Sequence, residues 1–478
     1  MNLMNAADLL NQNAADMAAA VRGGHVTATA LAHASLERIA ATQARVNAFT
    51  DVTAKRALQT AADLDTRLAI GDSTALALPL LGVPFAVKNL FDVADLTTLA
   101  GSKIERGKPV ATADAPLVAR MQAAGAVLVG ALNMDEYAYG FTTENTHYGA
   151  THNPHDLSRI AGGSSGGSGA AVAAGQVPIT LGSDTNGSIR VPASLCGVWG
   201  LKPTFGRLSR RGTYPFVYSI DHLGPMASTL GGLALAYDAL QCPDPLDTGC
   251  HALEVQPVVP QLSQGMEGLQ GLRIGVLGGY FHNHASPAAR EVVGLAAKTL
   301  GAQDEVIWPD AALSRAAAFI ITASEGGSLH LNDLRTRADE FEPLSVDRFI
   351  SGTLQPADWT IKAHRVRRMV RDKVNALFKD WDILLTAATP VSASLIGAEW
   401  LDINGTQHPA RAAMGLLTQP ISFAGCPVVA APMWPTTTGG MPIGVQIIAA
   451  PWREDLAFRA AHVLSSAGAA HTISPRAL

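Results

Sequence analysis

The chain has 478 residues, of which 48% are hydrophobic and 16% are charged, and its formal net charge is −5. This composition is typical of a compact globular protein and excludes a disordered chain, while the lack of a basic excess disfavours nucleic-acid binding. No apolar run reaches the roughly 20 residues that a membrane helix needs. Residues 1–20 also lack the basic and apolar regions of a secretory signal, so we expect a cytoplasmic protein that does not bind a membrane.

The four cysteines, Cys196, Cys242, Cys250 and Cys426, lie far apart in the sequence. They form no CxxC pair and have no zinc-type spacing. We therefore expect reduced thiols that pack as small apolar side chains. Neither a metal ion nor a cofactor is expected.

The first part of the chain alternates between helical and strand patterns. Residues 5–45 predict helices, the first ending at Gly23–Gly24 and the next beginning after a threonine cap. Residues 79–93, "PLLGVPFAVKNLFDV", predict a buried strand or hairpin, and 115–136 predict a helix, a glycine turn and a strand. Helix 168–174 and strand 177–182 follow. This alternation is typical of an α/β protein.

The segment 243–271 differs from its surroundings because it is rich in proline and glycine. We interpret it as a surface excursion. Strands are predicted after it at "LRIGVLGGYF" (272–281), "DILLTAATP" (382–390) and "MPIGVQIIAAP" (441–451). The segment could separate two domains, or the strands on its two sides could join one sheet.

Residues 162–194, "GGSSGGSGAAVAAGQVPITLGSDTNGSIRVPAS", form the most unusual stretch. A flexible linker is disfavoured because the stretch runs directly into an apolar helix and strand. A P-loop would need a lysine, and a dinucleotide fingerprint would need a preceding hydrophobic strand. The pattern G-x-S-x-G at 162–166 resembles a nucleophile elbow, but no buried strand comes before Ser164.

The stretch is best explained by two serines brought together from separate glycine-rich loops. Ser164 lies in the first loop and Ser188 in the second, with one helix and one strand between them. Glycines beside each serine allow main-chain N–H groups to approach a substrate and stabilise a tetrahedral intermediate. Lys88 lies alone among apolar residues upstream, where burial would lower its pKa and leave a neutral amine that can accept a proton.

These three elements, "GVPFAVKN", "GGSSGGS" and "SDTNGSIR", resemble the motifs of the amidase-signature family. The similarity runs from about residue 25 to 235 and returns near "GMPIGVQIIA". It implies a single domain over residues 1–478, with a large mixed central β-sheet covered by helices on both faces. It also implies an amidohydrolase with a Ser–Ser–Lys triad: Ser188 as the nucleophile, Ser164 as the bridging serine after a cis peptide bond, and Lys88 as the base. We expect these three side chains to form one hydrogen-bonded chain.

The same similarity implies an oxyanion hole formed by Thr185, Asn186, Gly187 and Ser188. Asn186 stands where most members of the family have glycine. Asparagine adopts a positive φ more readily than most residues, so we expect the turn to survive. The Asn186 side chain could also face the substrate. We interpret Asp184 as a residue that braces this turn, and Ser165 and Ser168 as hydrogen-bonding residues of the first loop.

Two branches of the family bear on the substrate. The glutaminase subunit of the tRNA-dependent amidotransferase binds the α-amino group of glutamine with an aspartate, whose place in this chain falls at Gly415. The stretches "DEYAYGFTTENTHYG" and "SDTNGSIRVPASLCG" resemble more closely a branch that acts on small anionic ureides such as 1-carboxybiuret, in cyanuric acid degradation. Such a substrate needs cationic or donor groups, and the candidates are Arg190, His147, His330 and Arg335. For Arg190 a structural ion pair is the alternative.

The resemblance also implies a small helical partner subunit, and either a homodimer or a heterotetramer. Three alternatives to a ureide hydrolase stay open: the amidotransferase glutaminase, a general amidase for small amides, and a non-catalytic scaffold. The scaffold is disfavoured because Lys88, Ser164 and Ser188 are all present.

Overall fold

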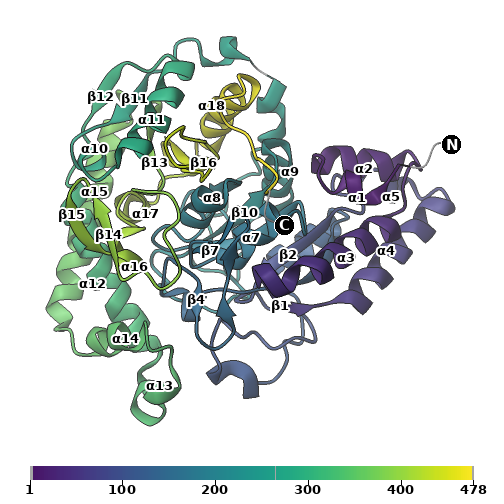
Figure 1. The fold of residues 1–478 in the computed structure, drawn as a ribbon, viewed down its shortest axis with the longest axis horizontal. Coiled ribbons are helices and arrows are strands. Elements are labelled where there is room, and N and C mark those ends of the chain that lie inside the picture. The colour runs from purple at the N-terminus through teal and green to yellow at the C-terminus, as the bar shows by residue number, and fades with distance from the viewer. Residues whose placement is uncertain (1–3, 264, 476–478) are drawn as a thin grey trace.

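The computed structural model describes residues 4–263 and 265–475, and within these ranges eleven strands form one central sheet (Figure 1). In spatial order they are β1 (Phe49–Val52), β3 (Val127–Leu132), β2 (Pro84–Lys88), β8 (Ile179–Asp184), β10 (His222–Ala227), β9 (Trp199–Lys202), β16 (Val428–Ala431), β17 (Val445–Ala449), β13 (Ile383–Ala387), β11 (Ile274–Leu277) and β12 (Asp304–Val306). Three two-stranded ribbons lie outside this sheet: β4 (Glu144–Asn145) with β5 (Gly149–Ala150), β6 (His152–Asn153) with β7 (Asp156–Ile160), and β14 (Trp400–Ile403) with β15 (Thr406–Pro409).

The central sheet is mixed, as expected. Strand β2 runs parallel to both β3 and β8, and β11 runs parallel to β12 and β13. The other neighbouring pairs, from β8 through β10, β9, β16 and β17 to β13, and β1 with β3, are antiparallel. Strands from both sides of the segment 243–271 therefore belong to one sheet. The single-domain organisation stays a prediction, and this topology supports it.

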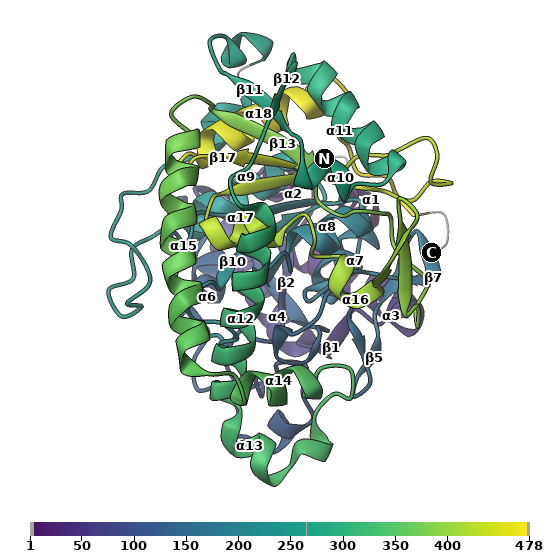
Figure 2. The ribbon, with the colours of Figure 1, turned by 90° about the vertical axis from the view of Figure 1, so that its left-hand side faces the viewer.

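The helices of the described residues are α1 (Ala6–Leu9), α2 (Ala14–Arg22), α3 (Ala28–Val46), α4 (Ala54–Ala69), α5 (Ser73–Leu76), α6 (Pro116–Ala123), α7 (Gly166–Ala173), α8 (Arg190–Cys196), α9 (Leu230–Leu240), α10 (Tyr280–Asn283), α11 (Pro287–Leu300), α12 (Ala311–Leu329), α13 (Leu331–Thr336), α14 (Val346–Thr353), α15 (Ala357–Leu377), α16 (Ala410–Ala413), α17 (Gln419–Ala424) and α18 (Glu454–Ser466). In Figure 2, α12 and α15 stand side by side, with α14 at one end of the pair. Helix α12 lies beside the second Gly/Ser-rich loop, because its Thr322 accepts a hydrogen bond from Asn186.

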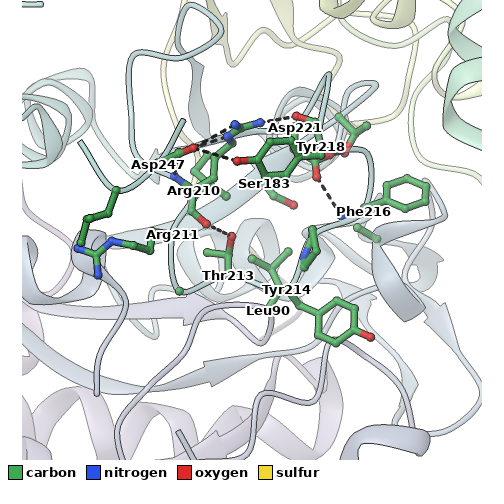
Figure 3. A pocket seen from close by; sticks show the side chains of 16 residues that line it. Leu90, Ser183, Arg210, Arg211, Thr213, Tyr214, Phe216, Tyr218, Asp221 and Asp247 are labelled. Carbon is green, nitrogen blue, oxygen red and sulfur yellow. Dashed lines mark hydrogen bonds and ion pairs between the residues drawn. The ribbon is translucent and has the colours of Figure 1, made fainter. Parts of the chain in front are cut away.

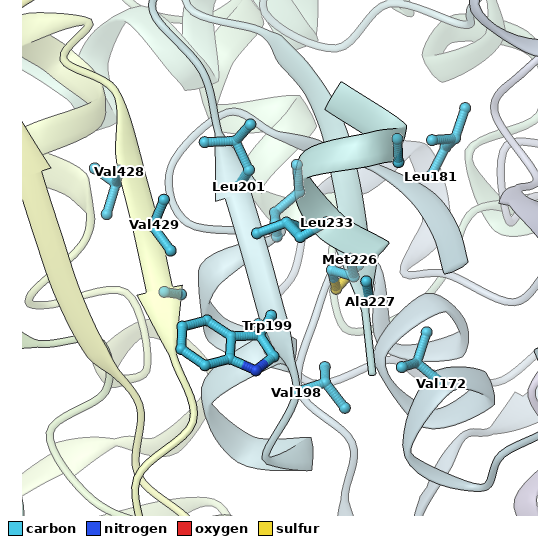
Figure 4. Close-up of a cluster of buried hydrophobic side chains, with 14 of the residues drawn as sticks. Val172, Leu181, Val198, Trp199, Leu201, Met226, Ala227, Leu233, Val428 and Val429 are labelled. Atoms are coloured by element: carbon cyan, nitrogen blue, oxygen red, sulfur yellow. The ribbon is translucent and has the colours of Figure 1, made fainter. Parts of the chain in front are cut away.

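Helices cover both faces of the sheet. Neighbouring residues of β10 show this, because successive side chains of a strand point to opposite faces. Met226 points to the face of the sheet that α8 covers, where it is close to Gly200 and Ala193. Ala227 points to the opposite face, which α9 covers, and lies close to Gly232. Apolar side chains of β8, β9, β10 and β16 join those of the helices in one core around Trp199 (Figure 4).

Most local predictions agree with the structure to within a few residues. The first predicted helix, which ends at Gly23–Gly24, is instead two helices, α1 and α2, with a break at residues 10–13. The Thr27 hydroxyl accepts a hydrogen bond from the N–H of Ala30 at the start of α3, as a capping threonine does. Residues 79–93 contain one parallel strand, β2, and not a hairpin. The predicted helix 168–174 begins two residues earlier, and the predicted strand 177–182 is shifted to Ile179–Asp184.

The excursion predicted at 243–271 has neither an α-helix nor a β-strand among its described residues. It contains two short 3₁₀ turns, Val259–Ser263 and Met266–Leu269, and much of it is exposed. The four cysteines form no disulfide. Among the described residues, no helix has the length and apolar character required to cross a membrane.

Candidate active site

The candidate site lies where two parallel neighbours of the sheet end. Strand β2 ends at Lys88, and β8 ends at Asp184 directly after Ser183. Because parallel neighbours end at the same edge of a sheet, these side chains meet although they are far apart in the sequence. The second glycine-rich loop leaves from this edge, between β8 and α8, whereas the first lies between β7, outside the central sheet, and α7.

Lys88 is completely buried at this edge. Its Nζ lies 2.7 Å from Ser164 Oγ and 2.9 Å from Ser183 Oγ. Burial lowers the pKa of Lys88 to about 7, although the negative charges of Asp135, Asp221 and Asp184 act in the opposite direction. A neutral amine with that pKa has two N–H donors and one lone pair, so it can donate to one serine and accept a proton from the other.

Ser164 follows a cis peptide bond from Gly163. The loop is held by main-chain and side-chain hydrogen bonds: the N–H of Ser165 donates to the carbonyl of Ser188 at 3.2 Å, and Ser165 Oγ donates to the carbonyl of Ser183 at 3.1 Å. Ser168 Oγ donates to the carbonyl of Leu181. Ser165 and Ser168 therefore have the loop-bracing contacts expected of them.

Ser188 is 2% exposed and lies in the second loop, next to the first. Within the described residues no hydrogen bond joins Ser188 Oγ to Ser164 Oγ. The expected chain is thus formed between Lys88 and Ser164 only. Lys88 instead has Ser183, which the motifs did not indicate, as its second partner. Catalytic hydrogen bonds are often long in a structure without substrate and shorten when the substrate binds.

The turn at residues 185–188 presents its N–H groups without an acceptor, as far as the described residues extend. Gly187 has a φ of +142°, and a Cβ at this position would lie 2.2 Å from Thr418 Oγ1, so only glycine fits there. Asp184 accepts hydrogen bonds from the N–H groups of Ile189 and Arg190 and braces the turn from behind. Unpaired N–H groups beside a serine are what an oxyanion requires.

Asn186 adapts to the turn differently from the expectation, because the positive φ belongs to Gly187 and not to Asn186. Its Nδ2 donates to Thr322 Oγ1 of α12 at 3.0 Å, and its Oδ1 is buried without a partner. The side chain lines a cavity next to Ser188. It therefore reaches the position from which it can contact a substrate.

We call that cavity the nucleophile chamber. It is lined by Ala138, Tyr139, Gly140, Phe141, Thr185, Asn186, Ser188, Phe216, Phe319, Thr322, Arg348, Ala412 and Gln419. Its volume of about 20 Å³ holds little more than one water molecule, so a ureide can enter only when side chains that line it move.

Arg348 of α14 is the cation that lines this chamber. Its guanidinium lies over the ring of Tyr139, with Cζ 5.5 Å from the ring centroid. In the part of the chain that the structure describes, it has neither a hydrogen bond nor an ion pair. A half-buried guanidinium without an anionic partner, beside a serine, is well suited to bind a carboxylate.

A second, larger chamber of about 260 Å³ lies on the lysine side of the turn (Figure 3). Ser183, Thr185 and Asp221 contribute to its wall, and it shares Ala138, Thr185 and Phe216 with the nucleophile chamber. Thr185 Oγ1 donates to Asp221 at 2.6 Å, which fixes the start of the oxyanion turn between the two chambers. Burial raises the pKa of Asp221, against the hydrogen bond from Thr185.

Arg190 does not line either chamber. It is fully buried, and its Nε and Nη2 form a bidentate pair with Asp184 at 2.9 Å each. The remaining N–H groups donate to Thr418, Gln446 and Ser422. All five donors are used within the protein, so Arg190 has a structural role and cannot bind the substrate.

The other three side chains predicted to bind the substrate either contact other protein groups or lie away from the nucleophile chamber. His147 Nε2 lies 3.1 Å from Glu136 Oε1. His330 is 1% exposed, packs 3.9 Å from Tyr137 between ring centroids, and has a pKa lowered to about 4 by burial. Arg335 is exposed on α13. None of the three lines the nucleophile chamber.

Gly415, the position compared with the glutamine-binding aspartate, packs against Phe141. A Cβ at Gly415 would lie 2.5 Å from Phe141 Cζ. The ring therefore occupies the space that a side chain at 415 would need. An apolar ring therefore stands where a carboxylate would be needed to bind the ammonium group of glutamine.

Sequence reasoning missed Ser183 and Arg348, and it also missed Asp135, which is buried, and Arg411, which is partly buried. Ser183 was detectable in principle, because it directly precedes the "DTNGS" turn at the end of a strand. Arg348 had no such signal, since it lies in a short helix next to another charged residue, Asp347, and no motif surrounds it.

Comparison with known proteins identifies the family of this chain and several similar proteins. Residues 30–457 match the family model described as Amidase. AtzE, a 1-carboxybiuret hydrolase subunit of Pseudomonas sp. (strain ADP), is 66% identical over 450 residues, which cover 94% of this chain and 97% of that protein. A glutamyl-tRNA(Gln) amidotransferase subunit of Roseiflexus sp. (strain RS-1) is 36% identical, over 93% of this chain and 94% of its own length.

A solved structure, described as an unexpected vestigial protein complex that reveals the origins of an s-triazine catabolic enzyme, superimposes with a TM-score of 0.95. It is 65% identical in sequence and covers 97% of this chain and 100% of its own.

Proposed function

Because the chain belongs to the amidase family, we propose that it hydrolyses a terminal C–N amide bond of 1-carboxybiuret, or of a closely related carboxylated ureide, and releases ammonia. The observation that carries the substrate class is Arg348, a guanidinium without an anionic partner in the chamber that contains Ser188. The substrate carboxylate would supply that partner through a charge-assisted, bidentate hydrogen bond. A small polar substrate with little apolar area needs such a contact for its orientation.

In the proposed mechanism, neutral Lys88 accepts the hydroxyl proton of Ser164 while Ser164 accepts the proton of Ser188. The Ser188 oxygen forms a bond to the amide carbon, and the π pair of the carbonyl moves onto its oxygen. The 2.7 Å contact between Lys88 and Ser164 supports the first transfer, and the lowered pKa of Lys88 supports its role as the base. Ser183 holds the lysine by the second hydrogen bond.

The oxyanion would be stabilised by the unpaired N–H groups of residues 185–188. When the intermediate collapses, the C–N bond breaks, and the proton on Lys88 passes through Ser164 to the departing nitrogen, which leaves as ammonia. A water molecule then attacks the ester of Ser188 and gives its proton to the same relay. The bond between the acyl carbon and the Ser188 oxygen then breaks, Ser188 regains its proton from the relay, and the new acid leaves and loses its own proton to solvent, so no cofactor is required.

Glutamine is the substrate of the principal alternative, the amidotransferase glutaminase. Its α-ammonium would need an anion near residue 415, where Phe141 fills the space. A site that lacks one partner of a buried charge pair discriminates strongly against the ligand that needs it. We therefore favour the ureide over glutamine, and over neutral small amides, which leave Arg348 unpaired.

A substrate comparison tests this proposal. Ammonia release from 1-carboxybiuret, biuret and glutamine is measured under one set of conditions, with the Ser188→Ala protein as the blank. We expect kcat/KM for 1-carboxybiuret to exceed that for glutamine by about 10²-fold or more, and biuret to be poorer than its carboxylated form. Glutamine as the best substrate would replace this proposal with the glutaminase activity.

We also propose that the enzyme works with a small helical partner subunit, as a heterotetramer, with a homodimer of this chain as the alternative. The proposal rests on the similarity to a chain that was solved as part of a protein complex. Mass measured by light scattering, for the chain alone and after co-expression with the gene of such a subunit, distinguishes the two assemblies.

For the location we propose the cytoplasm. The four cysteines are unpaired, as is usual where thiols are kept reduced. Cell fractionation followed by immunodetection tests this assignment, and recovery from the culture medium would contradict it.

A further inference from the structure

Asp135 is a buried carboxylate beside the candidate site that the proposed mechanism does not use. It follows β3 and is 2% exposed. Its N–H donates to the carbonyl of Ser164 at 3.3 Å, so it touches the bridging serine through the main chain. Burial raises the pKa of Asp135, and the positive charges of Arg411 and Lys88 oppose that shift.

One carboxylate oxygen of Asp135 fixes the first glycine-rich loop. Oδ2 accepts the N–H of Thr143 at 3.0 Å, and Thr143 Oγ1 in turn accepts the N–H of Gly166 at 3.1 Å. A Cβ at Gly163 would lie 2.0 Å from Oδ2, so the carboxylate packs directly against the residue that precedes Ser164. Loss of this contact would leave the loop without its support on that side.

The other carboxylate oxygen faces the wall of the nucleophile chamber. Oδ1 lies 3.5 Å from Arg411 Nη2, and a Cβ at Gly140, which lines the chamber, would lie 2.2 Å from it. Arg411 precedes Ala412, which also lines the chamber. Its Nε and Nη1 are buried without a hydrogen-bond partner. The Arg411 side chain is only 14% exposed, and Asp135 is the carboxylate that faces it.

From this geometry we propose that Asp135 is a positioning residue for the reaction, which ties the Ser164 loop to Arg411, the residue next to Ala412 in the wall of the nucleophile chamber. This proposal rests on the proposed function, in which Ser164 transfers the proton. Asp135 acts through two neighbours: through Thr143 and the main chain on Ser164, and through the ion pair on Arg411. Arg411 is paired with this carboxylate, whereas Arg348 has no such pair and stays available for the carboxylate of a substrate.

The test uses Asp135→Asn, which keeps the shape and removes the charge. The kcat should fall by at least about tenfold, because the loop that holds Ser164 is less well fixed. The acid limb of the kcat/KM profile should also move to lower pH. Asp135 is one of three carboxylates, with Asp221 and Asp184, whose charges raise the pKa of Lys88, so its neutralisation lowers that pKa. A merely structural role would not shift the limb.

Asp114→Asn is the matched control. Asp114 also accepts a main-chain N–H, that of Ala94 at 2.9 Å, and pairs with an arginine, Arg56, but it lines neither the nucleophile chamber nor the lysine-side chamber. This variant should keep the wild-type kcat and acid limb. Arg411→Met tests the link between Asp135 and Arg411, and it should raise the KM for the ureide. The double variant with Asp135→Asn should have the same KM as Arg411→Met, because the two residues act as a unit.

A second readout separates this inference from the substrate assignment. The rate at which a phosphonyl fluoride labels Ser188 needs the triad and no ureide, and it should show the same acid-limb shift in Asp135→Asn. If this variant is labelled at the wild-type rate with an unshifted limb, the inference is wrong. If it does not fold, an unchanged KM in Arg411→Met would overturn the link to Arg411. Absence of labelling in the wild-type protein would contradict the proposed mechanism itself.

Discussion

The ring of Phe141 lies against Gly415 so closely that a Cβ at position 415 would approach Phe141 Cζ to 2.5 Å. The two residues come from distant parts of the chain and meet at the wall of the nucleophile chamber. By the family resemblance, position 415 falls where the glutaminase branch is expected to carry its ammonium-binding aspartate. Here an aromatic ring excludes any side chain, and the chamber offers the cation of Arg348.

Gly415→Asp alone should not create a glutaminase. The new side chain collides with Phe141, so we expect the free energy of unfolding to fall by about 1–3 kcal/mol, as in other overpacked sites. The double variant Phe141→Ala with Gly415→Asp should recover part of this loss and hydrolyse glutamine faster than either single variant. Urea unfolding and ammonia release from glutamine measure the two effects. Equal stability of Gly415→Asp and wild type would contradict the packing argument.

Ser188→Ala and Lys88→Ala should each lower kcat by about 10⁴-fold or more. The triad acts as a unit, so the loss of one member costs nearly as much activity as the loss of all three. Lys202→Met provides a control, since Lys202 is equally buried and its pKa is also lowered to about 7 by burial. Its Nζ donates to the carbonyls of Pro203 and Cys426, however, and to no serine. We expect a kcat within a few-fold of wild type for the folded fraction of Lys202→Met. Full activity of Lys88→Ala would overturn the assignment of the base.

The activity should rise with pH through about 7. Only the neutral form of Lys88 accepts a proton, and burial lowers its pKa to about 7, so the ammonium form dominates below this pH and kcat/KM falls. The same limb should appear with 1-carboxybiuret and with uncharged biuret. A limb that appears only with the carboxylated substrate would belong to the substrate and not to Lys88.

Arg348→Gln should raise the KM for 1-carboxybiuret and lower kcat/KM by roughly 10- to 100-fold, because a hydrogen bond to a charged group contributes about 1.5–3 kcal/mol. Hydrolysis of neutral biuret should change much less. Arg335→Gln is the control, as Arg335 is exposed on α13 and lines neither chamber. An equal loss with both substrates in Arg348→Gln would show that Arg348 does not bind the carboxylate.

Arg190→Met should destabilise the protein by about 3–5 kcal/mol, because it leaves the buried charge of Asp184 unpaired. Burial alone would raise the pKa of Asp184, but the Arg190 guanidinium holds it below its usual range. Addition of Asp184→Leu should restore part of the stability, since no unpaired charge then remains. Denaturant midpoints of the three proteins test this, and a stable Arg190→Met would contradict a structural role for the arginine.

The sequence alone determined the features that depend on neighbouring residues. Apolar periodicity indicated the main helices and strands, because burial of one face leaves a local pattern. The glycines around Ser164 and Ser188 marked the two loops, because a turn such as that at Gly187 tolerates no side chain. The apolar setting of Lys88 predicted its burial, and with it a neutral amine.

Only the tertiary structure decided which side chains meet. The parallel pairing of β2 with β8 brings Ser183 to Lys88, and the position of α14 brings Arg348 to the chamber of Ser188. The same folding uses all five donors of Arg190 for Asp184 and its neighbours, and so removes it from the substrate site. A charged side chain has no periodic signature for its partner, because its partner is chosen by the order of strands and the packing of helices and not by its distance along the chain.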